Sequence, residues 1–319
     1  MLNVFTWGGL IPSSLIRKFE SETGIDVQVS TYDSNEALFA KLKVTHEYDV
    51  IMPSTYFIKK LTKLNLLEKL DQQQLPNLQH LKDRFKTEEF KTTNTHGAPF
   101  SWYTTGIFYN QKYYKHPIEH WHLLWQPKYQ NKLLLLDDPR ELFSATLIKL
   151  GYSPNDGSPK ALADAYNCLL SLQANIRLMI TNAIRGLIID EDFKVGMIWN
   201  SDMLKVQQEN NNIKYVLPRE GYPMSVDCLS ILKDAKHKKA AYQFINFLFD
   251  PKNSAKVMEI EGVSTTNADA AKFLPDNLRL NPILNPSDRT LAHGILIKDW
   301  GEKATNNMMS YWLKFKLSF

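Results

Sequence analysis

Hydrophobic and polar positions in the first two hundred residues follow two alternating periods. Short β-type runs predict strands at residues 2–6, 25–31, 49–52, 132–136 and 195–199. Between them, apolar residues recur at helical spacing over 12–23 and 139–150. Strands that alternate with helices are typical of an α/β fold whose strands are largely parallel.

Local signals predict where these helices begin and end. Gly24 and Gly151 follow two helical patterns at the position where a left-handed residue ends a helix. Asp33 and Glu36 bracket the start of a further helix as a capping box. Pro251 opens another helix where its missing N–H costs nothing, and the C-terminal third is predicted to be mostly helical.

The length of 319 residues predicts two domains, because single domains cluster at roughly 100 to 200 residues. Hydrophobic residues form 44% of the chain, which is enough to form packed cores. No linker is long or rich in Gly and Ser, so short strand crossings must join the two domains. No apolar run approaches the roughly 20 residues of a membrane span, which predicts a soluble protein.

The charge, the cysteines and the start of the chain indicate which partners and which cellular compartment to expect. A net charge of +4 from 38 basic and 34 acidic residues argues against a nucleic-acid partner. Cys168 and Cys228 are interpreted as two buried thiols, and nothing supports a disulfide. Met1 is followed at once by a strand pattern, so either the protein is cytosolic or a signal peptide has been removed.

Sequence motifs of catalysis are absent: the chain has no G-x-S-x-G, H-E-x-x-H, Walker, G-x-G-x-x-G or C-x-x-C pattern. His116, His120 and His122 have spacings that could ligate zinc on a helix, but Pro117 interrupts any helix there. We therefore interpret the histidines as a solvated loop, and we predict no metal, no cofactor and no catalytic residue.

Two carboxylates three residues apart, Asp138 and Glu141, have two interpretations. They share one side of a helix start and could bind an ammonium group together. With Pro139 between them they also match a capping box, which spacing alone favours. Trp7, Tyr56 and Trp199 lie where open α/β sheets place ligands, although core packing is the default for any aromatic residue.

Several separate stretches along the chain form a recognisable series: FTW (5–7), TGI (23–25), STYDSNE (30–36), YDV (48–50), PSTY (53–56), LLLLDDPRELF (133–143), KLGYS (149–153), GMIWN (196–200) and FINFL (244–248). In this order they resemble the spermidine/putrescine-binding proteins of bacterial ABC importers. The resemblance spans nearly the whole chain and is weakest after about residue 267.

The resemblance implies a fold, a site and a function. The fold is the two-lobed type II periplasmic-binding-protein architecture, α/β, with a mixed, mostly parallel sheet in each lobe and the ligand cleft between the lobes. One lobe would comprise residues 1–103 and 226–271, and the other 104–225 and 272–319, with the third crossing near Lys272. The implied ligand contacts are Trp7, Ser54, Tyr56, Asp138, Glu141, Trp199 and Asp227.

The same resemblance implies a function outside the inner membrane. A monomer in the periplasm would capture a polyamine-like cation and deliver it to a membrane permease without covalent chemistry. A sensor that uses the same cleft, a binder of another small amine and an enzyme on this fold are the alternatives.

The sequence departs from the family at positions that concern the ligand. The family has a hydroxyl residue, an acid and an aromatic after the tryptophan, where Gly8, Gly9 and Leu10 stand here. One anionic anchor is therefore missing, which predicts no strong preference for spermidine over putrescine. Further family contacts are absent at Ser225, near Val263 and near Ile297.

Overall fold

The first predicted strand is the middle one of three neighbouring parallel strands in the computed structural model, which describes residues 1–181 and 183–318. Strand β1 (Leu2–Trp7) pairs in parallel with β2 (Val27–Tyr32) on one side and β3 (Val50–Ile51) on the other. Strand β9 (Tyr222–Ile231) then pairs antiparallel with β3, and β10 (Ser264–Thr265) pairs antiparallel with β4 (Ala98–Asn110).

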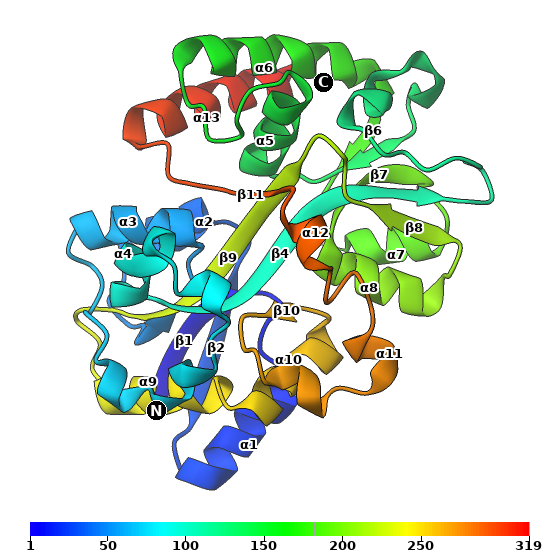
Figure 1. Ribbon diagram of the computed structural model, residues 1–319. Helices are drawn as coiled ribbons and strands as arrows, with labels where there is room; N and C mark the ends of the chain where they lie inside the picture. Colours follow the sequence, from blue (N-terminus) through cyan, green and yellow to red (C-terminus); the bar gives the residue numbers. More distant parts are fainter. Residues whose placement is uncertain (182, 319) are drawn as a thin grey trace. The chain divides into compact units, whose positions relative to one another are not determined.

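Strands β1, β2, β3 and β10, with residues 98–102 of β4 and 225–231 of β9, belong to the first of two compact units, which contains Met1–Trp102 and Ser225–Asn285. Figure 1 labels β1, β2, β4, β9 and β10. The sheet of this unit is mixed, with parallel strands at its start and the antiparallel β9 beside them. Its helices are α1 (Ser13–Thr23), α2 (Asn35–Leu42), α3 (Thr55–Lys63), α4 (Glu88–His96), α9 (Lys238–Leu248), α10 (Pro251–Glu261) and the short α11 (Asp276–Arg279).

The second unit contains Tyr103–Met224 and Pro286–Phe319. Its strands β5 (Leu133–Leu135), β6 (Ile176–Met179) and β7 (Val195–Trp199) are mutually parallel around β5. The C-terminal part of β4 pairs antiparallel with β7 and with β8 (Ile213–Val216). Strand β11 (Gly294–Leu296) pairs in parallel with the first residues of β9.

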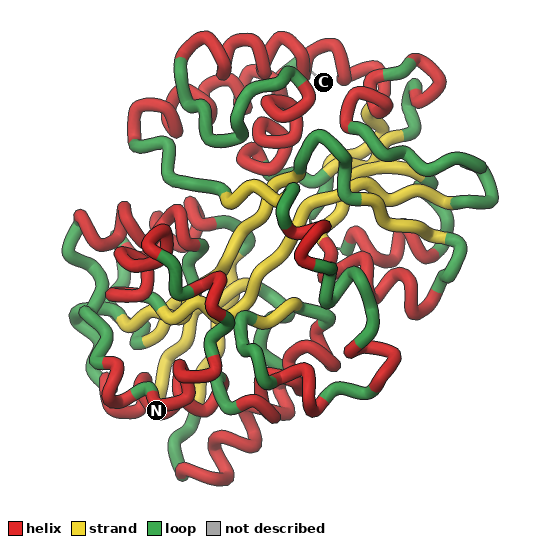
Figure 2. The backbone as a smooth tube through the Cα atoms, in the orientation of Figure 1, coloured by secondary structure: helices red, strands yellow, loops and turns green. Residues whose placement is uncertain are grey.

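Helices flank the strands of the second unit (Figure 2). Helix α13 packs against α6 and α5. The helices of this unit are α5 (Pro139–Lys149), α6 (Pro159–Leu172), α7 (Ile184–Ile189), α8 (Asn200–Glu209), α12 (Asp288–Leu291) and α13 (Glu302–Leu317).

The predicted strands and helices are present, with small differences in their bounds. Gly24 and Gly151 have positive φ of 70° and 82°, as the helix-ending signals predict. One capping prediction is wrong: α2 is capped by Ser34, whose hydroxyl accepts from Ala37 N–H at 3.0 Å, and not by Asp33. Ser34 caps the helix because it is the last extended residue before it, and an N-cap must occupy that position.

The two strands that cross between the units are β4 and β9, whose interiors contain the divisions at 102/103 and 224/225. The third division falls at 285/286, so the first unit includes residues 272–285. Buried Leu284 explains this extension, because its carbonyl accepts from the Ser264 hydroxyl at 2.8 Å.

The two cysteines differ in burial. Cys228 is a fully buried thiol on β9, whereas Cys168 on α6 is half-buried, and both are free. The prediction of a buried thiol is therefore correct for Cys228 and wrong for Cys168. Cys168 Sγ accepts a hydrogen bond from Lys149 Nζ at 3.2 Å, because the exposed margin of α6 leaves room for that ammonium group.

Candidate functional site

A hydrogen-bonded network in the first unit surrounds the carboxylate of Asp227. The Ser54 hydroxyl donates to Asp227 Oδ1 at 2.7 Å, and the two residues also form an antiparallel β-bridge. The Asn35 amide group donates to Ser54 Oγ at 3.1 Å and to the Tyr56 hydroxyl at 2.8 Å. Asn35 Oδ1 in turn accepts from Ser54 N–H at 3.1 Å. Asn35 therefore fixes two predicted site residues at once.

Asp227 carries an unusual carboxyl group because it lies almost out of water. Its exposed fraction is 2%, and burial raises its pKa from 3.8 to about 7, with the Ser54 hydrogen bond partly opposing that rise. A buried carboxylate needs a positive partner to remain charged at low cost. Asp227 is therefore suited to binding a cation.

Aromatic rings in the first unit lie beside this carboxylate network. Trp7 and Tyr32 are cross-strand neighbours in register at the ends of β1 and β2, and their ring centroids lie 4.8 Å apart. The Tyr32 hydroxyl donates to Met52 O at 2.5 Å. Burial raises the Tyr32 pKa most, and the nearby Asp227 and Tyr56 raise it too, whereas the hydrogen bond to Met52 lowers it, so the net rise keeps the phenol neutral. A neutral ring beside an anion offers a π face to a cation.

In the second unit, the two carboxylates at the start of α5 have different tasks. Asp138 is the N-cap residue, and its Oδ1 accepts from Glu141 N–H at 2.9 Å. The Glu141 side chain accepts instead from the Thr105 hydroxyl on β4, at 2.6 Å. Only the Asp138 half of the predicted capping box is therefore formed as expected, and the Glu141 carboxylate is available for another role.

Glu141 is buried and has a raised pKa. Its exposed fraction is 4%, and burial together with the charge of Asp138 raises its pKa to about 8. Burial also raises the pKa of the half-buried Asp138. Arg140 lies between them, but its guanidinium donates to Lys298 O at 2.8 Å and stacks over Trp300 at 3.5 Å. The charge of Arg140 lowers the pKa of both carboxyl groups and so partly opposes these rises.

Strand register places an aromatic ring next to the Thr105–Glu141 pair. Thr105 and Trp199 are cross-strand partners between β4 and β7. The Trp199 ring makes an edge contact with Tyr103, with centroids 5.7 Å apart. Trp199, Thr105 and Glu141 therefore form one cluster at the end of β7, the edge where open α/β sheets place ligands.

The structure divides the seven predicted contact residues between the units. Ser54, Tyr56 and Asp227 lie in one network of the first unit, and Trp7 joins them through Tyr32. Asp138, Glu141 and Trp199 form the group in the second unit. Sequence analysis missed Asn35, Tyr32 and Thr105, and only Tyr32 and Asn35, inside the stretch 30–36, had a signal that could have found them.

In the loop after β1, the glycine at residue 9 lies beside a carboxylate from α10. Gly9 is exposed and has a φ of 69°, a conformation that favours glycine. A β-carbon at residue 9 would lie 3.7 Å from Glu261 Oε2, at the end of α10. A carboxylate from a different helix therefore lies beside Gly9. The other departures, Ser225, Val263 and Ile297, are buried.

One group of potential metal ligands is present within the described residues: His120, His122 and Glu220 in the second unit. None of the three is a predicted contact for the organic ligand. His116 is not part of the group, and Glu220 is a member that the sequence did not indicate.

Comparison with known proteins identifies the family. Residues 14–284 match the model of the bacterial extracellular solute-binding proteins. The chain belongs to this family. A spermidine/putrescine-binding periplasmic protein of Salmonella typhimurium is 34% identical over 99% of this chain and 91% of its own. The putrescine-binding periplasmic protein SpuD of Pseudomonas aeruginosa is 31% identical over 99% of this chain and 92% of its own.

A solved structure agrees with the fold. The substrate-binding protein of a spermidine/putrescine ABC transporter from Streptococcus pneumoniae matches with a TM-score of 0.85 and 32% identity, covering 99% of this chain and 98% of that one. This likeness confirms the predicted α/β periplasmic-binding-protein fold. The family is one of solute-binding transport proteins rather than enzymes, and its members act outside the cytoplasm. No helix in residues 1–181 and 183–318 is long and apolar enough to span a membrane.

Proposed function

We propose that this protein captures a small polyamine, of the putrescine and spermidine class, and delivers it to the membrane permease of an ABC importer. The observation that carries this proposal is the pair of buried carboxylates with raised pKa, Asp227 in the first unit and Glu141 in the second. Each accepts a short hydrogen bond from one hydroxyl group.

The chemistry of a polyamine matches these groups. Its ammonium groups are joined by methylenes, so it needs anions separated by apolar walls. Glu141 and Asp227 would each accept an ammonium group, and Trp7, Tyr56 and Trp199 would contact the methylenes. Burial of the two carboxylates is unfavourable without a counter-charge, and the ligand supplies that charge. Asp138 adds a third anion beside Glu141.

In the proposed function, the protein only binds and releases its ligand and does not change it chemically. It acts in the periplasm as a monomer, with no cofactor, no covalent step and no nucleic-acid partner. Relatives named as spermidine/putrescine-binding and putrescine-binding periplasmic proteins support the binding role and the periplasmic location, because they align over nearly their full lengths.

In this proposal, the end of the site near residue 9 determines whether the protein prefers a longer or a shorter polyamine. Absence of an acid at residue 9 favours a weak preference for spermidine over putrescine. Glu261 opposes that effect, because its carboxylate lies beside Gly9. If spermidine is nevertheless strongly preferred, Glu261 is the first residue to test as its anchor.

Calorimetry tests the function directly. Purified protein is titrated with putrescine, spermidine, lysine and choline, and we expect the two polyamines to bind most tightly. Turnover of any of these amines would contradict a binding protein. Absence of binding to both polyamines, by a protein that melts cooperatively, would overturn the ligand class.

A further inference from the structure

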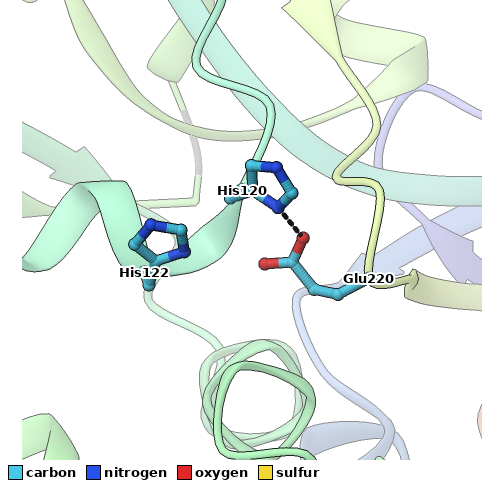
Figure 3. A group of neighbouring side chains, drawn as sticks. All are labelled: His120, His122 and Glu220. Atoms are coloured by element: carbon cyan, nitrogen blue, oxygen red, sulfur yellow. Dashed lines mark hydrogen bonds and ion pairs between the residues drawn. The ribbon is translucent and has the colours of Figure 1, made fainter.

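Two histidines and a glutamate from separate segments meet on the second unit, away from the carboxylate clusters in sequence. His120, His122 and Glu220 each offer a ligand atom, and these atoms all lie within 4.8 Å of one another (Figure 3). His120 Nδ1 lies 2.7 Å from Glu220 Oε2. The two imidazole rings have centroids 5.4 Å apart.

The backbone around this group is held in place by contacts between its two segments. Trp121 N–H donates to Glu220 Oε1 at 2.6 Å, and the buried Trp121 indole donates to Gly221 O at 2.9 Å. Arg219 N–H donates to Glu119 O at 3.0 Å. Both segments are therefore positioned before any ligand arrives, which lowers the cost of assembling a site.

A purely structural role accounts for only part of the arrangement. Glu220 caps the 3₁₀ helix η4 (Trp121–Trp125) by accepting from Trp121 N–H, and its other oxygen accepts from the His120 ring. His122 takes no part in that cap: it is exposed, and the contact described for it is the ring of His120. His122 is therefore the residue that separates a helix cap from a ligand site.

We propose that His120, His122 and Glu220 bind a divalent transition cation of the zinc class. Two imidazoles and one carboxylate form a ligand set that zinc accepts with a fourth, open position for water. Bonds of about 2.0 to 2.2 Å place tetrahedral ligand atoms roughly 3.3 Å apart. Binding therefore requires rotation of the exposed His122 side chain toward the other two ligands. The Trp121 N–H bond to Glu220 then acts as the outer contact that orients a ligand.

The sequence predicted a solvated loop here because Pro117 breaks any helix that would align His116 with His120. The structure agrees that no α-helix joins them, since the first helical segment after His116 is the 3₁₀ helix η4 (Trp121–Trp125). The third ligand comes instead from Glu220, 100 residues from His120. The prediction of no metal site is therefore replaced by this proposal.

Calorimetric titration with ZnCl2 tests the site, using protein that carries no polyhistidine tag. We expect one zinc per chain, and we expect His122→Ala to weaken binding by about tenfold or more. His116→Ala is the matched control, because it removes a nearby imidazole outside the group. Melting of both variants without zinc should equal that of the parent.

Three results would overturn the proposal. They are absence of saturable zinc binding at millimolar concentration, an equal loss in His116→Ala and His122→Ala, and calcium binding as tight as zinc binding. The last would indicate an oxygen site, since imidazole favours zinc over calcium. Putrescine titration of His122→Ala should match the parent, which keeps this site distinct from the proposed polyamine site.

Discussion

The two buried carboxyl groups of the candidate site, Asp227 and Glu141, both have a raised pKa, but their surroundings differ. Asp227 lies on strand β9 with one hydroxyl donor and no second carboxylate in its network. Glu141 lies in the first turn of α5, where the helix dipole favours an anion, yet its pKa is raised to about 8. Burial and the charge of Asp138 outweigh the dipole there. A helix N-terminus alone therefore does not keep a buried carboxylate ionised.

This comparison also predicts unequal tolerance to mutation. Asp227 is the single anion of its network, whereas Asp138 remains beside Glu141 when that residue is neutralised. The first unit should therefore depend on one residue and the second on two.

The largest effect should come from Asp227→Asn. The amide cannot supply the negative charge that a partly dry ammonium group needs, so we expect putrescine affinity to fall by at least about tenfold, measured by calorimetry. Asp234→Asn, an exposed aspartate of the same unit, is the control and should bind as the parent does. Parent-like binding by Asp227→Asn would assign Asp227 a structural role.

Glu141→Gln should also weaken binding by about tenfold, but by less than Asp227→Asn, because Asp138 retains one charge. The matched control is Glu209→Gln at the exposed end of α8. The double variant Asp138→Asn with Glu141→Gln should lose more than either alone. A larger loss for Glu141→Gln than for Asp227→Asn would reverse the comparison.

Binding should strengthen as pH rises from about 5.5 to 8.5. A cation binds the ionised carboxylates, and the pKa values of about 7 and 8 mean that both are largely protonated at the acidic end. Affinity for putrescine, measured by calorimetry across this range, should therefore increase and then level off. A flat profile would show that neither carboxylate contacts the ligand.

The ligand-free protein should show the opposite trend in stability. Because Asp227 has a higher pKa folded than unfolded, the folded state binds more protons between about pH 4 and 7. Its contribution to the unfolding free energy therefore falls as pH rises through that range. Melting temperatures of the parent and Asp227→Asn should diverge with pH, the variant showing the shallower decline. Parallel curves would contradict the raised pKa.

The smallest effect concerns ligand length. We expect the parent to bind spermidine and putrescine within about tenfold of each other. Glu261→Gln should weaken spermidine more than putrescine, and Glu259→Gln on the same helix is the control. Gly9→Glu is a poor test, because the φ of 69° strains any side chain there and Glu261 would repel the new charge.

The sequence by itself determined the alternation of strands and helices and the ends of several helices. These features follow from short-range causes: apolar periodicity, the left-handed preference of Gly24 and Gly151, and caps such as Asp138. The residue types of the seven contact positions also came from the sequence, although their roles came from a family resemblance.

Only the tertiary structure decided which of these residues share a site. The Ser54–Asp227 pair joins positions 173 apart, and Thr105–Glu141 joins positions 36 apart. Tertiary folding likewise brings Glu220 to His120, and it places Glu261 beside Gly9. The tertiary structure also determines the charge states of these carboxyl groups. The pKa of a carboxyl group depends on its burial by other chain segments, and no local sequence pattern specifies that burial.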